Sequence, residues 1–326
     1  MNGKRAAYAA LAVTAVSAIL APAYSAETYP SRVIRYIIPF APGGGQDTVA
    51  RQLAPRLSEG LGQQVVVDNR PGGGTILGTE IAAKSAPDGY TIAMVSNTSH
   101  AINPNLHKKL PYDPVADFAP VTQIASLANI LVVHPSLPAR TLKEFVALAK
   151  SRPGELNFGS SGSGTPAQLA GVMFSQAAGV KMVHVPYKGS SPALTALLSG
   201  ETQLMFGSMT SSIPFVKNGR LRALAVTGSK RAVAVPDVPT VSESGYPGFE
   251  ATTWYGIAVP VGTPSPIIKR LHAEVVKIIT AADFRKYLIS QGADPIGSTP
   301  EEFGALIRAE LKNYAKIVRD AGLRPD

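Results

Sequence analysis

Short apolar stretches rich in β-branched residues alternate with helical patterns along most of this chain, and this alternation limits the fold more than any other feature. In the first hundred residues, strands are expected at 32–40, 64–67 and 90–96, with helices at 47–61 and 75–84 between them. Strands that alternate with helices form parallel sheets with helices on their faces. The sequence therefore predicts an α/β fold.

The same alternation continues through the rest of the chain. Thr141 and Glu144 have the spacing of a capping box, which predicts a helix that ends near residue 151. A second capping box, Thr299 with Glu302, has Pro300 in the first turn and predicts the last of three helical patterns after residue 260. The other expected elements are strands at 156–159, 182–185, 202–206, 221–227 and 255–260, and helices at 166–178 and 192–198.

The first 26 residues have the pattern of a secretion signal. Lys4 and Arg5 give a basic start, residues 6–20 are apolar or small, and cleavage is expected near Ala23 to Ala26. A permanent membrane anchor is the alternative, but the apolar run is shorter than the roughly 20 residues that span a bilayer. The chain contains no cysteine, so it can form neither a disulfide nor a lipid anchor on cysteine. These features predict a soluble protein exported to the periplasm.

The remaining chain is expected to form two lobes. About 300 residues exceed what a single hydrophobic core usually serves. No linker rich in Gly, Pro or Ser separates consecutive domains, so we expect the chain to cross between the lobes more than once, at 126–134 and 250–260. Residues 231–249 are expected to form a long ordered surface connection. Lobe I is assigned to residues 27–127 plus 253–326, and lobe II to residues 128–252.

The charge of the chain is mildly basic. It contains 31 Lys and Arg and 22 Asp and Glu residues, and removal of the leader takes away two basic residues, which lowers the net charge from +9 to +7. The basic residues are scattered, with no run longer than two, which argues against a nucleic-acid partner. A basic field would still help to gather anionic solutes.

Two loops of similar composition, residues 39–47 and 159–166, each join an expected strand to an expected helix. Glycines in such loops let a ligand approach the backbone amides closely. The free amides and dipole of the following helix then favour a negative group. Each loop taken alone is more often an ordinary turn. Two of them, one in each expected lobe, favour a shared anion-binding cleft.

Sharper chemical motifs are absent from the sequence. No Gly-Lys-Ser/Thr closes a phosphate loop, and Leu77 stands where the third glycine of a dinucleotide fingerprint belongs. Ser163 replaces the second glycine of a nucleophile elbow. The five histidines lack zinc-ligand spacing, so neither a metal nor a cofactor is expected. A serine hydrolase built on the loop at Ser160, with His184 as base, is the alternative to a protein without enzymatic activity; His184 is otherwise expected to be structural.

Several other residues have two interpretations. Asp47 is expected to cap its helix; as a ligand contact it would suit an amine, or an anion only through water. Tyr187 and Lys188 end a strand, where a hydroxyl and a charge would suit a carboxylate, although a surface lysine is more common. Trp254 and Tyr255 are expected to be packing residues at the second crossing.

The chain resembles the Bug-type solute receptors of the tripartite tricarboxylate transporter family over its whole mature length. The matching stretches are residues 29–32, 39–44, 67–72, 86–90, 100–104, 110–114, 156–160, 184–189, 221–227, 235–240 and 320–326. This resemblance implies a two-lobed, type II-like periplasmic-binding-protein fold whose lobes close on a small organic carboxylate. It also implies a membrane permease as partner, with a membrane sensor as the alternative; we expect a monomer.

The resemblance also implies a set of ligand-binding residues. In such receptors the loop from Phe40 to Asp47 binds a carboxylate through backbone amides and water. The complete expected set is Phe40, Pro42, Gly43, Gly44, Asp47, Ser96, Asn97, Thr98, Ser160, Ser161, Gly162, Ser163, Gly164, Thr165, Gln168, Tyr187, Lys188, Phe206, Gly207 and Ser208.

One position departs from the family pattern. Many relatives place Asp and Asn after the phenylalanine at position 206, whereas Gly207 and Ser208 stand here. An acid at that point would suit the amino group of an amino acid. Its absence makes an amino-acid ligand less favourable than a purely anionic one.

Overall fold

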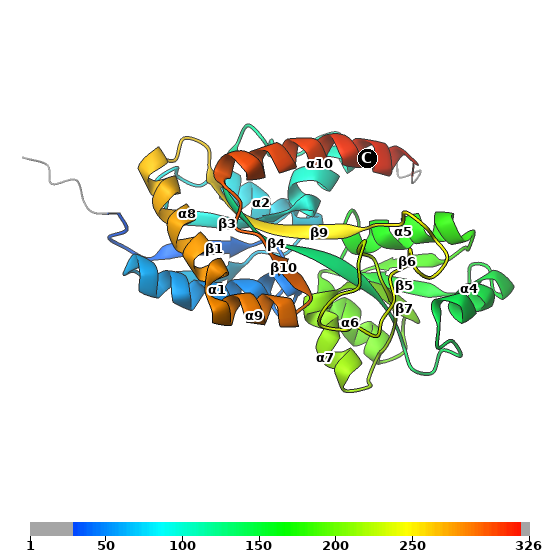
Figure 1. Ribbon diagram of the computed structural model, residues 1–326. Helices are drawn as coiled ribbons and strands as arrows, with labels where there is room; N and C mark the ends of the chain where they lie inside the picture. The colour runs from blue at the N-terminus through cyan, green and yellow to red at the C-terminus, as the bar shows by residue number, and fades with distance from the viewer. Residues whose placement is uncertain (1–28, 321–326) are drawn as a thin grey trace, which may run out of the picture.

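The computed structural model describes residues 29–320, so the expected secretion signal lies outside the described residues. Eight of its ten strands form one path of hydrogen-bonded neighbours in the order β2-β1-β3-β9-β4-β7-β5-β6, and β8 and β10 each pair with β4 off this path. Figure 1 shows that this path is divided between two lobes that lie side by side, with β4 and β9 running lengthwise between them. The structure is α/β, as the alternating pattern predicted.

The first lobe contains both ends of the described chain. Parallel pairing joins β1 to β2 and β3, and antiparallel pairing joins β9 to β3 and β4. The strands of this lobe are β1 (Ile34–Ile38), β2 (Val65–Asn69), β3 (Thr91–Ser96), β9 (Thr252–Pro260), β10 (Ala293–Pro295) and the first part of β4 (Phe118–Val133). Its helices are α1 (Gly45–Leu61), α2 (Ile76–Ala83), α3 (Asn103–Leu106), α8 (Ser265–Thr280), α9 (Ala282–Ser290) and α10 (Pro300–Asp320), with short turns η1 (Gly73–Thr75) and η2 (Thr98–Ile102).

The second lobe repeats the arrangement around the other end of β4. Here β5 pairs in parallel with β6 and β7, while β7 and β8 pair antiparallel with β4. Its other elements are α4 (Leu142–Ser151), β5 (Asn157–Ser160), α5 (Pro166–Ala178), β6 (Val183–Pro186), α6 (Ser190–Leu198), β7 (Leu204–Ser208), α7 (Met209–Lys217) and β8 (Arg222–Val226). Each sheet is therefore mixed: three of its strands pair in parallel, and β4 pairs antiparallel with its neighbours in both sheets.

Strand β4 changes partners in the middle of its length. Residues up to Ala128 pair with β9, whereas residues from Asn129 onward pair with β7 and β8. The chain returns through the segment before β9, where Thr227 Oγ1 donates to the carbonyl of Ala251 and accepts from the amide of Asn129. These two neighbouring connections are the crossings that the sequence suggested, although β4 begins earlier than the expected crossing.

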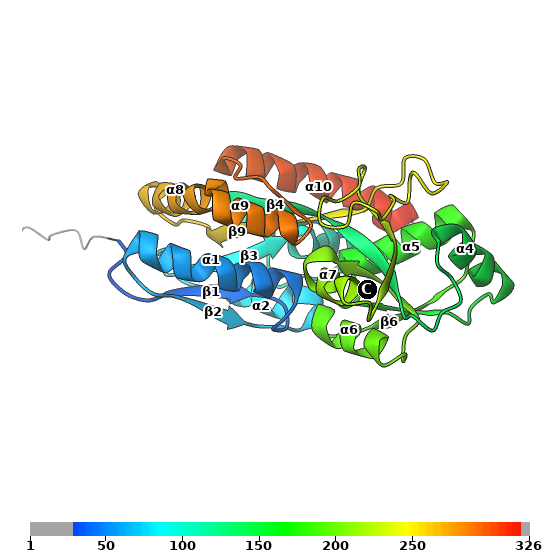
Figure 2. The same ribbon diagram turned by 60° about the horizontal axis from the view of Figure 1, so that its bottom comes forward.

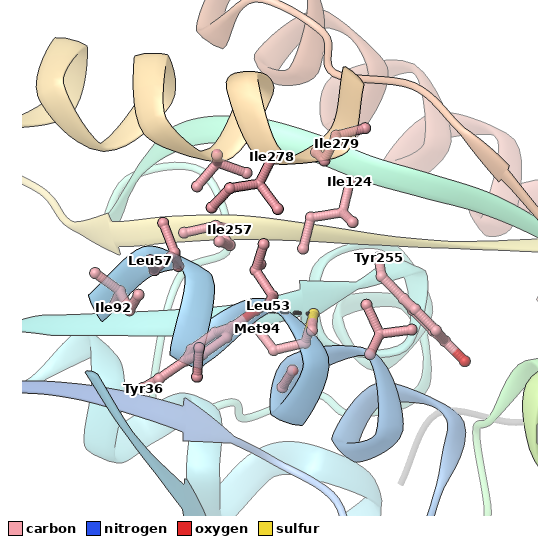
Figure 3. Close-up of a cluster of buried hydrophobic side chains, with 14 of the residues drawn as sticks. Tyr36, Leu53, Leu57, Ile92, Met94, Ile124, Tyr255, Ile257, Ile278 and Ile279 are labelled. Carbon is pink, nitrogen blue, oxygen red and sulfur yellow. Dashed lines mark hydrogen bonds between the residues drawn. The ribbon is translucent and has the colours of Figure 1, made fainter. Parts of the chain in front are cut away.

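Both faces of both sheets are covered by apolar clusters. In the first lobe, one cluster packs under α1, α8 and α9 and includes Tyr36 and Leu53 (Figure 3), while Trp254 and Phe303 pack on the opposite face. In the second lobe, the largest cluster gathers around Phe174, whose ring contacts four other aromatic rings. Burial on both faces explains why the strands have continuous apolar sequences.

The helix starts show why the capping pattern was informative. The amide of Glu302 donates to Thr299 Oγ1, and the amide of Thr299 donates to Glu302 Oε2, which confirms the second capping box. Helix α7 and strand β10 were not expected from the sequence. The segment at 231–249 contains turns and no helix, and its residues Val235 and Val241 are buried, as expected for an ordered connection.

Candidate functional site

Four strand-to-helix turns meet at the boundary between the lobes. The first lobe supplies the turn from β1 to α1, and the second lobe supplies the turns into α5, α6 and α7. In Figure 2, α1 points across the boundary toward α7, which lies in contact with it. The carboxyl ends of strands in α/β sheets are the usual place for a ligand crevice.

These turns enclose a cavity of about 40 Å³. At roughly 10–15 Å³ per water molecule, the cavity has room for about three waters. Its wall comes from both lobes and from the crossing strands: Phe40, Gly44, Gly45, Gln46, Thr98, Asn129, Ser161, Pro166, Ala167, Ser190, Ser208, Thr253 and Tyr255. The lobes also touch directly, since Ser191 Oγ donates to the carbonyl of Pro42 at 2.9 Å.

The first amides of all four helices face this region without a side-chain cap. Within residues 29–320, no side chain accepts a capping hydrogen bond at the start of α1, α5, α6 or α7. The residue at or next to each helix start lines the cavity: Gly44, Pro166, Ser190 and Ser208. Each helix N-terminus carries about half a positive charge. The cavity is therefore an electropositive site made from backbone.

No charged side chain lines this cavity. Its side-chain polar groups are the hydroxyls of serine, threonine and tyrosine and the amides of Gln46 and Asn129. Burial raises the pKa of Tyr255 to about 12, so its hydroxyl stays a neutral hydrogen-bond donor. Hydroxyls and free amides donate to an anion, and an ammonium group would find no carboxylate among the lining residues.

Asp47 fastens the first loop and does not line the cavity. Its Oδ2 accepts from the amide of Gly43 at 2.8 Å and from Arg51 Nε at 2.8 Å, and its Oδ1 accepts from Asn69 Nδ2 at 2.9 Å. Burial by itself would raise the pKa of Asp47, but the hydrogen bonds from Arg51, Gly43 and Asn69 hold it below its usual value. Asp47 therefore stays ionised and holds the loop, while the Gly43 amide is already engaged.

Neutral groups fasten the second loop. Ser160 Oγ accepts from the amide of Gly162, Thr165 Oγ1 donates to the carbonyl of Gly162, and Gln168 Oε1 accepts from the amide of Gly164. His184 Nε2 lies 2.6 Å from Ser160 Oγ. Burial lowers the pKa of His184 to about 4, so the ring is neutral.

The pair of Ser160 and His184 is the arrangement that a serine hydrolase would need. However, Ser160 is fully buried and lines none of the pockets between the lobes, so its hydroxyl does not face a substrate. The structure thus gives this pair a loop-fastening role.

Tyr187 and Lys188 line a separate, larger cleft of about 320 Å³ beside the cavity, together with Gly162 and Ser163. Phe40 and Ser161 line both spaces. The Tyr187 hydroxyl donates to Glu201 Oε1 at 2.7 Å, and Lys188 is exposed. These two residues therefore do not reach the central cavity.

The remaining expected residues lie behind the cavity wall. Asn97 is buried and connects β9 to α10, since its Nδ2 donates to the Tyr314 hydroxyl and its Oδ1 accepts from Thr253 Oγ1. Ser96 is buried at the end of β3. Phe206 belongs to the core of the second lobe, and Gly207 pairs with Ile130 in the sheet.

Eight cavity-lining residues were absent from the expected set: Gly45, Gln46, Asn129, Pro166, Ala167, Ser190, Thr253 and Tyr255. The first two residues of α1 and of α5 belong to the helix N-termini that were expected to bind the anion. Extending the expected set by one or two residues at each loop would have included Gly45, Gln46, Pro166 and Ala167. Tyr255, expected to be a packing residue, has its ring in the core and its hydroxyl directed away from it (Figure 3).

Two other classes of feature were sought in residues 29–320. No helix in that range is long and apolar enough to cross a bilayer. The same range contains no group of three His, Asp or Glu side chains positioned to hold a metal ion.

Comparison with known proteins gives matches over nearly the whole chain. Residues 49–323 match the family described as "Tripartite tricarboxylate transporter family receptor". An R. palustris protein solved with adipate has a TM-score of 0.90 and 35% sequence identity, covering 91% of this chain and 100% of its own.

Two further solved structures are similar. The periplasmic binding protein BugD has a TM-score of 0.88 and 32% identity, covering 91% of this chain and 100% of its own. MatC from Rhodopseudomonas palustris, solved with bound malate, has a TM-score of 0.84 and 32% identity, covering 89% and 100%. The expected two-lobed periplasmic-binding-protein fold is confirmed.

Proposed function

This chain belongs to the tripartite tricarboxylate transporter receptor family, as its resemblance to Bug-type receptors predicted, and from that premise we propose that it captures a small organic carboxylate in the periplasm. In this proposal the lobes, divided near residues 127–128 and 252–253, close on the ligand. The closed receptor then delivers it, as a monomer without enzymatic activity, to a membrane permease. The basic and apolar start of the chain supports export.

One observation carries the proposal: four uncapped helix N-termini meet at a cavity whose lining contains no charged side chain. Such a site favours a negative group through amides and hydroxyls. Two similar proteins were solved with the carboxylates adipate and malate, which agrees with this chemistry.

The absence of an acid from the cavity wall narrows the class of ligand. An ammonium group placed there would lose its water without gaining a carboxylate partner. Ser208 lines the wall next to the position where many relatives carry an acid. We therefore propose that amino acids are poor ligands.

Isothermal titration with succinate, malate and aspartate tests both the carboxylate site and the exclusion of amino acids, because these three acids differ only in one substituent. We expect succinate or malate to bind, and aspartate to bind at least about tenfold more weakly, which corresponds to about 1.4 kcal/mol. Ser208→Asp should shift the preference toward aspartate. Binding of a neutral sugar but of no carboxylate would refute the carboxylate site, whereas tight binding of aspartate to the wild type would refute only the ligand class.

Delivery to a permease needs a cellular test. In a strain without this receptor, uptake of the best-binding labelled carboxylate should fall, and return when the chain is restored. Normal uptake, combined with a lost transcriptional response to the same carboxylate, would instead assign the protein to a membrane sensor.

A further inference from the structure

Gly45, the first residue of α1, occupies a narrow space at the cavity wall. A Cβ atom on Gly45 would lie 2.5 Å from Ser208 Oγ and 3.3 Å from Ser208 Cβ in the second lobe. It would also lie 2.7 Å from Tyr255 Oη in the first lobe. Cβ atoms in proteins do not approach other atoms as closely as 2.5 Å, so a side chain at position 45 would force Ser208 or Tyr255 to shift when the lobes have this arrangement.

Tyr255 forms the fixed side of this space. Its ring is 5% exposed and belongs to the core of the first lobe, and its backbone pairs with Ser96 on one side and Ala125 on the other. Figure 3 shows the hydroxyl at the edge of the cluster. A side chain at position 45 would therefore be pressed toward Ser208, which is the N-cap residue of α7 in the opposite lobe.

We propose that Gly45 is a positioning residue for the ligand, because the absence of a side chain there lets the lobes close far enough for the helix N-termini to surround one anion. This inference rests on the proposed carboxylate receptor. A methyl group at position 45 would act as a wedge between the lobes and hold the amides of α1 away from those of α5, α6 and α7.

A glycine away from the cavity provides a matched control. Gly304 lies in α10, and a Cβ there would meet no atom closer than Arg308 Nη1 and Pro120 Cγ, both at 3.4 Å. Neither Gly304 nor Gly45 has a positive φ angle, so alanine adds no backbone strain at either position. Gly304 lines neither the cavity nor the neighbouring cleft, and Gly45→Ala keeps the backbone amide that would face the ligand.

The distance between the lobes can be measured directly, because the natural chain contains no cysteine. Gln64→Cys and Lys150→Cys, both at exposed positions in different lobes, would carry spin labels for pulsed electron–electron distance measurement. We expect the short, closed-lobe distance to be depleted in Gly45→Ala and unchanged in Gly304→Ala, relative to the wild type. Equal distance distributions in the two variants would overturn the inference, even if no carboxylate bound.

The affinity of the best-binding carboxylate gives the second measurement. Gly45→Ala should weaken binding roughly 10- to 100-fold, in the range expected for overpacking strain, while Gly304→Ala stays near the wild type. If the wild type binds and both variants bind equally well, the inference fails while the proposed function stands. If the wild type binds no carboxylate, the proposed function fails. The spin-label distances still test whether a methyl group at position 45 holds the lobes apart.

A second substitution separates a wedge between the lobes from strain within one lobe. Ser208→Gly removes both atoms that the new methyl would meet in the opposite lobe, and glycine is tolerated at an N-cap. In the Gly45→Ala background it should restore the closed-lobe distance and most of the affinity. No restoration would mean that the methyl acts only against Tyr255, which contradicts the proposal.

Discussion

The two loops, residues 39–47 and 159–166, each contain three glycines, but different groups hold them in place. In the first loop, the ionised carboxylate of Asp47 accepts hydrogen bonds from the Gly43 amide, Arg51 and Asn69. In the second loop, neutral side chains hold the backbone in place: Ser160 and Gln168 accept hydrogen bonds from the loop amides. A hydrogen bond to a charged group is stronger than a neutral one, so the first loop depends more on a single residue.

The helices that follow the loops also differ. Helix α1 begins with Gly45, whose amide is free to point at a ligand, whereas α5 begins with Pro166, which has no amide hydrogen. The first loop therefore offers one more donor at the first helical position. A glycine-rich loop between a strand and a helix therefore predicts where a site lies. It predicts neither the number of hydrogen-bond donors in the site nor the side chains that hold the loop in place.

The largest difference between the loops should appear on removal of Asp47. The carboxylate is almost completely buried, and Asp47→Asn leaves Arg51 and the Gly43 amide without an ionised acceptor. We expect a loss of about 2–3 kcal/mol in the free energy of unfolding, measured by urea titration, together with weaker carboxylate binding. Arg51 is half exposed, which keeps the loss below that of a fully buried pair.

A surface ion pair is the control for this substitution. Asp88→Asn removes a pairing with Arg32 in which both side chains are substantially exposed, and it should leave the urea midpoint nearly unchanged. Equal effects of the two substitutions would show that Asp47 does not fasten the first loop.

The fold was predictable to the extent that each element follows from its own sequence. The strand at β1 is apolar except for Arg35, and α10 starts at a capping box, so both could be located without the structure. Helix α7 was missed because Pro214 lies inside it and Ser and Thr fill its first turn. The long strand β4 was only partly recognised, because its partner β9 lies more than a hundred residues later in the chain.

The site was predictable where it consists of backbone and not where it depends on tertiary packing. The loops pointed to Gly44 and Ser161, and both line the cavity, since helix N-termini attract anions whatever side chains surround them. Nothing local distinguishes Asn129 or Tyr255, which reach the cavity because crossing strands pass behind it. Tyr187 was expected there, but its hydroxyl turns to Glu201.

The two loops should also differ in how their contributions to stability depend on pH. Burial lowers the pKa of His184 from 6.5 to about 4. Between pH 6.5 and pH 4, His184 is therefore protonated in the unfolded chain and neutral in the folded chain. The free energy of unfolding should therefore fall as the pH drops from about 6.5 toward 4. The pKa of Asp47 is lowered, so its contribution is lost only at still lower pH.

Urea midpoints of the wild type and His184→Gln between pH 7 and pH 4.5 measure this effect. The variant should be less sensitive to pH, because it lacks the group that takes up the proton on unfolding. His100, whose pKa burial lowers to about 3, contributes equally to both proteins, so the difference between the curves isolates His184. Parallel curves would show that His184 is not held neutral beside Ser160.

The smallest effect is expected for the neutral fastening of the second loop by Gln168. Its Oε1 accepts from the Gly164 amide at 2.6 Å, a neutral hydrogen bond at a partly exposed position. Gln168→Leu should lower the free energy of unfolding by about 1 kcal/mol, less than Asp47→Asn, because no charge is left without a partner. Gln168→Glu keeps the acceptor and so should keep the stability, but it adds a negative charge in the first turn of α5 beside the cavity. Titration calorimetry should then show weaker carboxylate binding by Gln168→Glu in a protein that is as stable as the wild type. Unchanged affinity in that variant would mean that the N-terminus of α5 contributes little to holding the anion, leaving α1, α6 and α7 as the donors.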